Sequence, residues 1–334
     1  MFKIEERMNL MDLVSILIPC YNHENYINDC LNSIITQTYS EIELLIIDDC
    51  STDDSFNILK SWEKKLKYRF RNVYIDRNTT NQGIVKTLNK MLTLANGKYI
   101  KWIASDDMLL SNAIENLLEF AHKGENDIIF SNVAFIKTDT TYPVIIDNSF
   151  RIYYQTLPPI GKNLTGILCG RNFIATPGSF VPKKTFDRFG FFDETYIFED
   201  WEFWLRVSIN GNFGYLDCIT ALYRENNSSL SHFEISESGK KRQRLLHQNK
   251  QMIFKKYQSY ANNTQQTQFF NQELRVALSL DDVSLANEIN SEMKAQHFLI
   301  SLDNKIRWIF THMHLYFILR KIKMFLTTRS IKCK

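Results

Sequence analysis

Several features that mark particular protein classes are missing from this sequence of 334 residues. No run of about 18 uninterrupted apolar residues occurs, so the sequence predicts no membrane-spanning helix. Residues 1–12 mix charged and apolar side chains, a pattern that differs from that of a signal peptide. The 6 cysteines contain no CxxC pair and no metal-ligand spacing, so we expect free thiols in a reducing compartment, the cytoplasm.

The sequence also has no internal repeat, and its composition is that of a globular protein. With 44% hydrophobic and 23% charged residues, it excludes a disordered chain, a collagen and a disulfide-stapled miniprotein. The charge is distributed unevenly: residues 1–232 carry 23 Lys and Arg against 29 Asp and Glu, a net charge of −6. Residues 233–334 carry 17 against 8, a net charge of +9. This asymmetry indicates an anionic partner for the C-terminal part, either a membrane surface or a nucleic acid.

Strand and helix signals alternate through the first 136 residues. Short apolar runs predict strands, and apolar residues at helical spacing predict helices between them. We expect strands over residues 14–19, 43–47, 73–76, 99–104 and 127–136, and helices over 24–38, about 51–67, 83–95 and 111–122. Asn96-Gly97 is expected to cap the C-terminus of the third of these helices. Repeated β-α-β units with short links predict an α/β fold, with a mostly parallel central sheet flanked by helices.

The remainder of the chain is less regular. Residues 137–175 contain several prolines and glycines and are expected to form a long loop region, whereas residues 176–232 return to order. Gly178-Ser179 indicates either a close approach of the backbone to a ligand or a simple turn. Residues 233–334 predict a mainly helical extension, with the Gln- and Asn-rich stretch 262–272 as a loop between helices.

Acidic pairs follow two of the expected strands. Ligands of parallel α/β sheets bind at the carboxyl ends of the strands, where Asp106-Asp107 and Asp48-Asp49 stand. Two adjacent buried carboxylates are costly without a cation or hydrogen-bond donors, so Asp106-Asp107 predicts either a metal and diphosphate site or a helix N-cap. Asp48-Asp49 similarly predicts either a hydrogen bond to a base or ribose or a helix cap.

A third acidic element is Glu199-Asp200, which precedes an aromatic helical stretch. Trp201, Trp204 and Leu205 have helical spacing and are expected to be buried. Asp200 would then stand at the start of the helix. There it would act either as a general base beside a dry aromatic surface or as an acid that stabilises the helix dipole.

Taken together, these segments resemble a family 2 glycosyltransferase of the GT-A fold. The resemblance covers about residues 12–232, and the last hundred residues lie outside it. It implies a catalytic domain over residues 1–232, with a nucleotide-binding part at 12–136 and an acceptor part at 137–232, followed by a helical region at 233–334. The ordered segments that carry it are VSILIPCYN (14–22), IIDDCSTDDS (46–55), NQG (81–83), NGKYIKWIASDD (96–107), TPGSF (176–180), FGFFDE (189–194) and FEDWEFWLRV (198–207).

The resemblance implies roles for single residues. Pro19 and Tyr21 would line the nucleotide pocket, with Tyr21 packing on the base. Asp49 would bind the base or ribose, and Asp106 would contact the ribose or sugar. Asp107 would ligate the Mn²⁺ or Mg²⁺ ion that bridges the diphosphate.

The resemblance also implies that Asp200 is the catalytic base of an inverting, single-displacement transfer. Many relatives carry Tyr-Arg-x-His after the last strand, where the His helps hold the diphosphate or metal. Here Asn226 stands at the His position, and His232 follows six residues later as a substitute or a surface residue. Arg224 and Lys86 are expected either to contact the diphosphate or to serve as ordinary solvated or ion-paired residues.

The C-terminal segment 301–334 holds eight Lys and Arg and one acid, interleaved with apolar and aromatic residues. This pattern predicts either an interfacial helix on anionic lipid or a packing helix that closes the domain or an oligomer contact. Because no other segment suggests base or groove readout, we expect no nucleic-acid partner.

The sequence thus predicts an inverting glycosyltransferase, peripheral at the inner face of the cell membrane. Its donor would be a nucleotide sugar, most simply a UDP-sugar, and its acceptor a lipid-linked glycan of a bacterial surface polysaccharide. One alternative is a sugar nucleotidyltransferase, but residues 19–26 lack the basic, Gly-rich phosphate loop of such enzymes. The other alternative is a non-catalytic nucleotide-sugar-binding module, in which the acids need not be retained.

Overall fold

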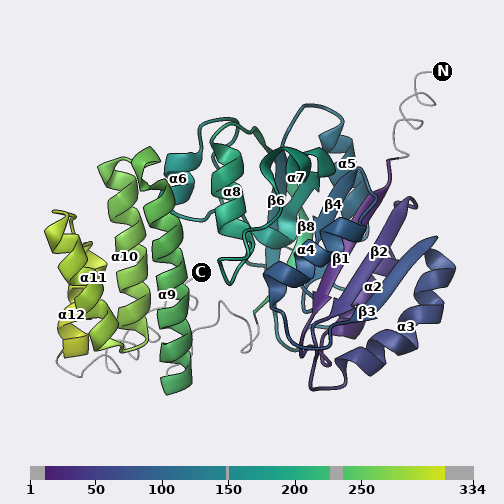
Figure 1. Cartoon of the computed structure of the whole chain (residues 1–334), viewed down its shortest axis with the longest axis horizontal. Coiled ribbons are helices and arrows are strands. Elements are labelled where there is room, and N and C mark those ends of the chain that lie inside the picture. The colour runs from purple at the N-terminus through teal and green to yellow at the C-terminus, as the bar shows by residue number, and fades with distance from the viewer. Residues whose placement is uncertain (1–11, 148–149, 226–235, 313–334) are drawn as a thin grey trace. The chain divides into compact units, whose positions relative to one another are not determined.

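The computed structural model describes residues 12–147, 150–225 and 236–312 (Figure 1). The chain forms two compact units. The first, called the sheet unit here, comprises Met1–Leu164 and Phe173–Asn226, and the second, the helical unit, comprises Thr165–Asn172 and Asn227–Lys334. The predicted boundary at residue 232 lies outside the described residues and stays a prediction. The chain also passes from one unit to the other and back within the expected loop region 137–175.

The sheet unit is built on one mixed sheet with the strand order β3-β2-β1-β4-β7-β6-β8-β5. The pairs β3-β2, β2-β1, β1-β4 and β6-β8 are parallel, whereas β7 runs antiparallel to both β4 and β6. The predicted α/β fold with a mostly parallel sheet is therefore confirmed. The strands are β1 (Val14–Cys20), β2 (Ile42–Asp48), β3 (Asn72–Arg77), β4 (Tyr99–Trp102), β5 (Met108–Leu109), β6 (Ile128–Lys137), β7 (Ser179–Pro182) and β8 (Phe213–Glu225).

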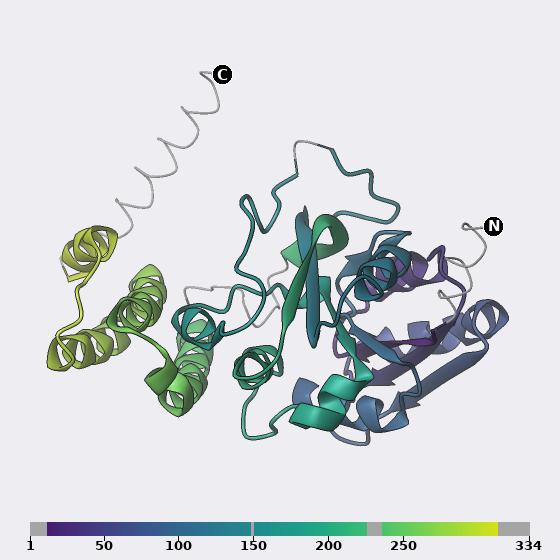
Figure 2. The same ribbon diagram turned by 90° about the horizontal axis from the view of Figure 1, so that it is seen from above.

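Helices cover the sheet because its strands are apolar on both faces. Alternate residues of β1 and β2, such as Ile16 and Leu44, share one core with α2, α3 and α5, while α4 packs against β1 and β2 (Figures 1 and 2). The helices of this unit are α2 (Ile27–Ile35), α3 (Ser55–Arg69), α4 (Ile84–Leu94), α5 (Ala113–Ala121), α7 (Lys183–Phe189) and α8 (Asp200–Ser208), with the 3₁₀ turn η1 (Thr176–Gly178).

The predicted cap at Asn96-Gly97 is wrong. Helix α4 ends at Leu94, and Ala95 already has an extended conformation. Gly97 instead lies against β1: its amide donates to Ser15 Oγ (2.8 Å) and to Glu43 Oε1 (3.0 Å). A β-carbon at this position would lie 2.5 Å from the Ser15 amide nitrogen, so the glycine permits a close approach between backbones.

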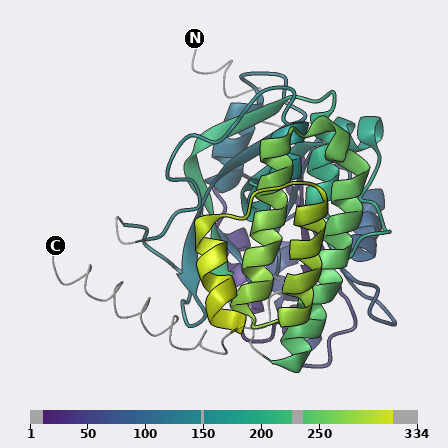
Figure 3. The same cartoon turned by 90° about the vertical axis from the view of Figure 1, so that its left-hand side faces the viewer.

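The helical unit consists of α6 (Thr165–Gly170), α9 (Glu237–Tyr257), η2 (Gln258–Tyr260), α10 (Asn263–Ser279), α11 (Val283–Ala295) and α12 (Leu302–His312). Figure 3 shows α9 to α12 packed beside one another. The predicted loop at 262–272 is wrong, because Asn262 and Gln265 form a reciprocal capping box that starts α10 there.

Helix α6 interrupts the expected loop region 137–175 and packs on α9 and α10. Its two glycines allow this contact, since a β-carbon on Gly170 would lie 2.8 Å from the carbonyl oxygen of Gln265. Within the described part of the chain, no helix is both long and apolar enough to cross a membrane. The cysteines of the described residues, Cys20, Cys30, Cys50, Cys169 and Cys218, are free thiols.

Candidate active site

Strands β1 to β4 end at one edge of the sheet, and hydrogen bonds join the loops that follow them. The Asn22 amide donates to Ser51 Oγ (2.9 Å), and the Thr52 amide donates to Asn22 Oδ1 (2.8 Å). Asn22 and Cys50 both have left-handed backbone conformations, with φ of 54° and 64°. Non-glycine residues in this region carry strain of about 1–3 kcal/mol, which the surrounding contacts must hold.

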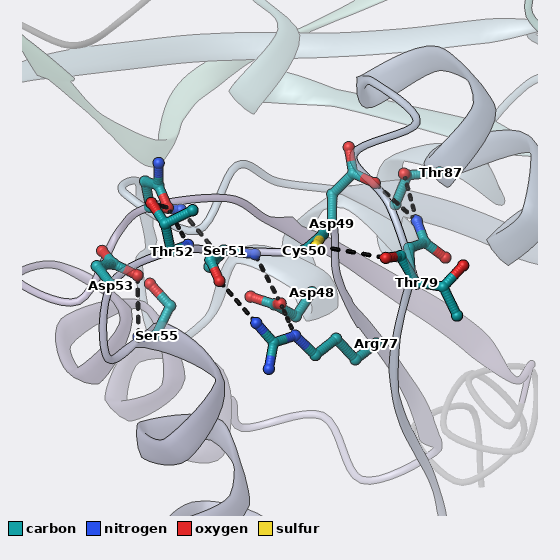
Figure 4. Close-up of polar contacts among 12 residues, drawn as sticks. Asp48, Asp49, Cys50, Ser51, Thr52, Asp53, Ser55, Arg77, Thr79 and Thr87 are labelled. Atoms are coloured by element: carbon teal, nitrogen blue, oxygen red, sulfur yellow. Dashed lines mark hydrogen bonds and ion pairs between the residues drawn. The ribbon is translucent and has the colours of Figure 1, made fainter.

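The two acids of the first pair have different roles (Figure 4). Asp48 is fully buried, and its Oδ2 accepts from the Ser51 amide (3.0 Å) and from Arg77 Nε (3.1 Å). It is therefore a structural residue of the turn. A third acid, Asp53, holds the start of helix α3. Its Oδ1 accepts from the amide of Ser55, the first residue of that helix (3.0 Å).

Asp49 binds the loop that precedes α4. Its Oδ1 accepts from Asn78 Nδ2 and the Gln82 amide, and its Oδ2 accepts from the Gly83 amide, each at 2.8 Å. Asp49 thereby fixes the NQG segment at the edge of the sheet. Each carboxylate oxygen carries two lone pairs, so Oδ2 keeps acceptor capacity for a further donor.

Pro19 and Tyr21, which are expected to line the nucleotide pocket, lie at the end of β1. Pro19 is buried within the strand, opposite Ile47 of β2, so it shapes the floor of this edge. Tyr21 follows the strand, and 43% of its surface is exposed. Its ring is thus available at the carboxyl end of the sheet for packing against a planar group.

The second acid pair follows β4 and is buried, with Asp106 7% and Asp107 2% exposed. Burial, together with the neighbouring charge of Asp106, raises the pKa of Asp107 well above its usual range. One hydrogen bond opposes this rise, since the backbone amide of Arg224 donates to Asp107 Oδ1 (2.8 Å). Ionisation of both acids is therefore disfavoured in the protein alone, and a bound cation would lower the free energy of the ionised pair.

Arg224 is buried, and its guanidinium group contacts acceptors of the protein itself. Its side chain is 1% exposed, and Nε donates to the carbonyl oxygen of Asp106 (2.8 Å). The terminal nitrogens donate to three carbonyl oxygens at and just after the end of β6 and to Asp29 Oδ2 (3.4 Å). Each guanidinium nitrogen thus has an acceptor within the protein, and the predicted diphosphate contact stays a prediction. The related positions Asn226 and His232 lie outside the described residues.

His23 belongs to this edge although the sequence interpretation did not include it. Its Nδ1 lies 2.8 Å from Ser105 Oγ, and its Nε2 lies 3.8 Å from Asp106 Oδ2. The imidazole therefore connects the loop after β1 with the acid pair. No local pattern marks this residue, because its partner Ser105 is 82 positions away in the chain.

Asp200 reaches the same edge through β7 and α8. Since β7 is antiparallel to β4, its first residue and the preceding turn η1 lie at the carboxyl end of β4. The Thr176 hydroxyl of η1 donates to Asp200 Oδ2 (3.0 Å). Helix α8 is held there by Trp204, whose ring stacks on Trp102 of β4 with centroids 5.6 Å apart.

Glu199, to which the sequence interpretation assigns no role of its own, is the buried neighbour of Asp200. Burial, followed by the charge of Asp200, raises the pKa of Glu199 to about 8.

Lys86, in contrast, is exposed in the first turn of α4, and its predicted diphosphate contact stays a prediction. No cluster of three or more His, Cys, Asp or Glu side chains suited to a metal occurs among the described residues. Asp106 and Asp107 remain as a donor pair that suits an ion also bound by substrate phosphates.

A hollow of about 690 Å³ occurs in the sheet unit, away from these acids. It lies at the amino end of β4, against Gly97, Lys98 and Tyr99. None of the predicted site residues lines it, so the candidate site is defined by the strand-end side chains and not by this hollow.

Comparison with known proteins agrees with this assignment. The family description "Glycosyl transferase family 2" matches residues 15–179. TuaG of Bacillus subtilis (strain 168), named as a teichuronic acid biosynthesis glycosyltransferase, is 34% identical over 133 residues, which are 40% of this chain and 51% of TuaG. The glycosyltransferase GlyA of Streptococcus pneumoniae serotype 4 is 35% identical over 121 residues, 36% of this chain and 17% of GlyA.

Among solved structures, TarS of S. aureus (residues 1–349, in complex with UDP-GlcNAc) has a TM-score of 0.54 at 17% identity, with 92% of each chain covered. This likeness concerns the fold. The chain spans about half the length of TuaG and between 17% and 59% of the length of the other curated relatives compared. The matched segment contains both acid pairs and belongs to glycosyltransferase family 2.

Proposed function

We propose that this protein transfers a sugar from a nucleoside-diphosphate sugar, a UDP-sugar, to an acceptor hydroxyl with inversion at the anomeric carbon. The observation that carries the proposal is that three acidic elements lie along the carboxyl edge of the sheet. Asp49 follows β2, Asp106-Asp107 follow β4, and Asp200 accepts from Thr176, which lies at the carboxyl end of β4. Family membership supports transferase chemistry, and the UDP-GlcNAc bound by TarS supports a UDP-sugar donor.

The donor would lie across the ends of β1, β2 and β4. Tyr21 offers an exposed ring for the base, and Asp49 offers an acceptor for a base or ribose donor. Asp106, which lies beside His23, would contact the ribose or the sugar. Pro19 would contribute to the floor of the pocket.

Asp107, with Asp106 beside it, would hold Mn²⁺ or Mg²⁺. The buried pair fits such an ion because burial and the repulsion between the two carboxylates disfavour their ionisation, and a divalent cation would offset both effects. When bound, a divalent ion neutralises the charge that develops on the departing diphosphate.

Asp200 would act as the general base. Its carboxylate takes the proton of the acceptor hydroxyl while that oxygen forms a bond to the anomeric carbon. The bond from that carbon to the diphosphate breaks, and the nucleoside diphosphate leaves with the electron pair. Because Thr176 donates to Oδ2 and the Trp201 amide to Oδ1 (2.6 Å), the carboxylate is held in one orientation before the acceptor arrives.

The acceptor would be a lipid-linked glycan of a bacterial surface polysaccharide, reached from the inner face of the cell membrane. The name of TuaG supports a polysaccharide pathway. Helix α12 supports a membrane contact, because Leu302, Ile306 and Ile309 are 74%, 41% and 55% exposed along it. Most of the basic segment 301–334 that prompted this proposal lies outside the described residues, and an oligomer contact remains its alternative.

The proposal is tested with the purified chain, a panel of UDP-sugars and Mn²⁺, Mg²⁺ or EDTA, by measuring release of UDP. We expect metal-dependent turnover and a loss of about 10³-fold in Asp200→Asn and in Asp107→Ala. Asp76→Asn, which removes an exposed ion pair with Lys90, serves as the control and should retain activity. Retained turnover in both site variants would eliminate the proposal, and release of pyrophosphate from a nucleoside triphosphate and a sugar phosphate would favour the nucleotidyltransferase.

A further inference from the structure

We infer that Lys101 is a positioning residue for the reaction: it holds the turn Thr176–Gly178, and this turn holds the base Asp200. The inference rests on the proposed function, in which Asp200 removes the proton of the acceptor. Thr176 already holds one oxygen of the Asp200 carboxylate in that function, whereas Lys101 has no role assigned in it.

Lys101 is buried in β4 with 0% exposure. Its ammonium group donates to the carbonyl oxygens of Pro177 and Ser179, the latter at 2.9 Å. Burial lowers the pKa of Lys101 to about 7, against the opposing effect of the Asp107 charge. A cation buried in this way is costly, and an apolar side chain could fill the same strand position at lower cost. Since an apolar side chain would suffice for packing, the contacts of the ammonium group are what distinguishes Lys101 at this position.

Those contacts fall within and directly after the turn, which other contacts also hold in place. A β-carbon on Gly178 would lie 2.6 Å from the carbonyl oxygen of Ser131, so the turn lies directly against β6. The Ser179 hydroxyl donates to the carbonyl oxygen of Thr176 (2.7 Å). At Gly178 the backbone thus closely approaches a strand of the protein itself, and the predicted approach of Gly178-Ser179 to a ligand stays a prediction. Lys101 adds a third attachment, to β4.

The turn ends in a contact with the base. Thr176 Oγ1 donates to Asp200 Oδ2 (3.0 Å), so the position of the turn sets the position of one carboxylate oxygen. A displacement of about 1 Å at a reacting group is enough to cost a large factor in rate. The path from β4 to the base therefore consists of one buried cation, two carbonyl oxygens and one hydroxyl, and β4 is also the strand that leads into Asp106-Asp107.

A purely structural role for Lys101 makes a different prediction from a positioning role. Residues that act only in the chemical step lower kcat and leave the KM for the donor nearly unchanged. Loss of folding instead lowers the amount of active enzyme together with the melting temperature. The two roles are therefore separable by steady-state kinetics on protein whose folding is measured in parallel.

The test compares Lys101→Met and Thr176→Val with two matched controls. Lys183→Met removes another lysine whose ammonium donates to a carbonyl oxygen, that of Ala95, and Thr185→Val removes another hydroxyl that donates to a carbonyl oxygen, that of Asp127. We expect kcat to fall at least 10-fold in both test variants with the donor KM within 2-fold of wild type. Both controls should retain kcat within 2-fold.

The pH profile supplies a second measurement. A carboxylate that loses a hydrogen-bond donor is protonated more readily, so Thr176→Val should move the acid limb of kcat toward higher pH. The double variant should lose less than the product of the two single losses, because both changes release the same turn.

Wild-type kcat in Thr176→Val, or a loss in Lys101→Met that only follows its melting temperature, would overturn the inference. Asp200→Asn in the same assay keeps the two proposals apart. If Asp200→Asn retains turnover, the proposed function has failed. If it is inactive while Lys101→Met and Thr176→Val match wild type, only the positioning role has failed.

Discussion

Two pairs of adjacent carboxyl groups determine the electrostatics of the site, Asp106-Asp107 and Glu199-Asp200. Burial raises the pKa of Asp107 and of Glu199, with the adjacent acid as the second cause in each case. Two carboxylates so close together do not both ionise freely, and the more buried member of a pair retains its proton first. Glu199 at neutral pH therefore carries the proton of its pair, which leaves Asp200 as the proton acceptor.

This arrangement makes the stability of the fold depend on pH through Glu199. Its pKa is about 8 in the folded chain and 4.5 for the ordinary group, so the folded state binds more protons between these values. The stabilising effect is complete below pH 4.5 and is lost as the pH rises through about 8.

Glu199→Gln, which cannot ionise, should remove this dependence. Relative to wild type, we expect the variant to gain on the order of 3 kcal/mol in the free energy of unfolding between pH 5.5 and pH 8.5. Urea denaturation at the two pH values measures the difference. Parallel pH dependence in the two proteins would show that Glu199 ionises normally in the folded chain.

At the scale of elements, β4 connects the parts of the site. The strand leads into Asp106-Asp107, Lys101 within it holds η1, and Trp102 packs against Trp204 of α8. Its amino end depends on Gly97, which lies against β1 and donates to Ser15 and Glu43. The position of β4 is thus fixed at both ends by contacts with segments far away in the sequence.

Gly97→Ala tests the close approach at the start of β4. The added β-carbon would lie 2.5 Å from the Ser15 amide nitrogen and 3.0 Å from the carbonyl oxygen of Leu13, and backbone atoms cannot move aside easily. We expect a loss of about 1–3 kcal/mol in the free energy of unfolding. Gly124→Ala is the matched control, because its nearest neighbour is a side-chain nitrogen at 3.7 Å. Equal effects of both substitutions on chemical denaturation would contradict the proposed steric cause.

At the scale of the whole molecule, the helical unit is assembled from two separate stretches of chain. Helix α6 lies between segments of the sheet unit in sequence, yet it packs on α9 and α10, and its residues Leu168 and Cys169 are fully buried. A cut at the sequence-predicted boundary would therefore divide a packed unit.

A chain truncated after residue 226 should accordingly fail as an independent domain. It retains α6 without α9 and α10, so we expect exposed apolar surface and aggregation, measured by size-exclusion chromatography and light scattering. Replacement of residues 165–172 by a Gly-Ser linker in the same truncated chain should restore a monodisperse protein. A soluble, monodisperse truncated chain that retains α6 would show that the packing of α6 is dispensable.

The proposed membrane contact is also a property of the whole chain. We expect the full chain to sediment with vesicles that contain phosphatidylglycerol, to do so less at high salt, and to bind vesicles of phosphatidylcholine poorly. The double change Ile306→Glu and Ile309→Glu should lower the bound fraction at least 10-fold. Leu157→Glu, at a 76% exposed position of the sheet unit, is the control. Binding unchanged by the double variant, with association of copies in its place, would favour the oligomer interpretation.

The sequence by itself determined the elements of the parallel half of the sheet and the acids at their ends. Buried strands, amphipathic helices and strand-end acids are local patterns, so strands β1 to β4 and β6 lie close to where apolar runs predicted them. The same locality explains the errors at Asn96-Gly97 and at residues 262–272, where turn-forming residues serve a close approach and a capping box.

Only the tertiary structure decided which distant groups meet. The insertion of β7 between β4 and β6 brings Thr176 to Asp200 and the carbonyl oxygens at η1 to Lys101. The periodicity of a single segment does not predict this insertion. The acceptors of Arg224 lie at least 84 residues away from it in the chain, and no local pattern predicts these long-range hydrogen bonds. Sequence patterns specify which face of an element is apolar, whereas strand order and the pairing of buried polar groups depend on how all the elements pack at once.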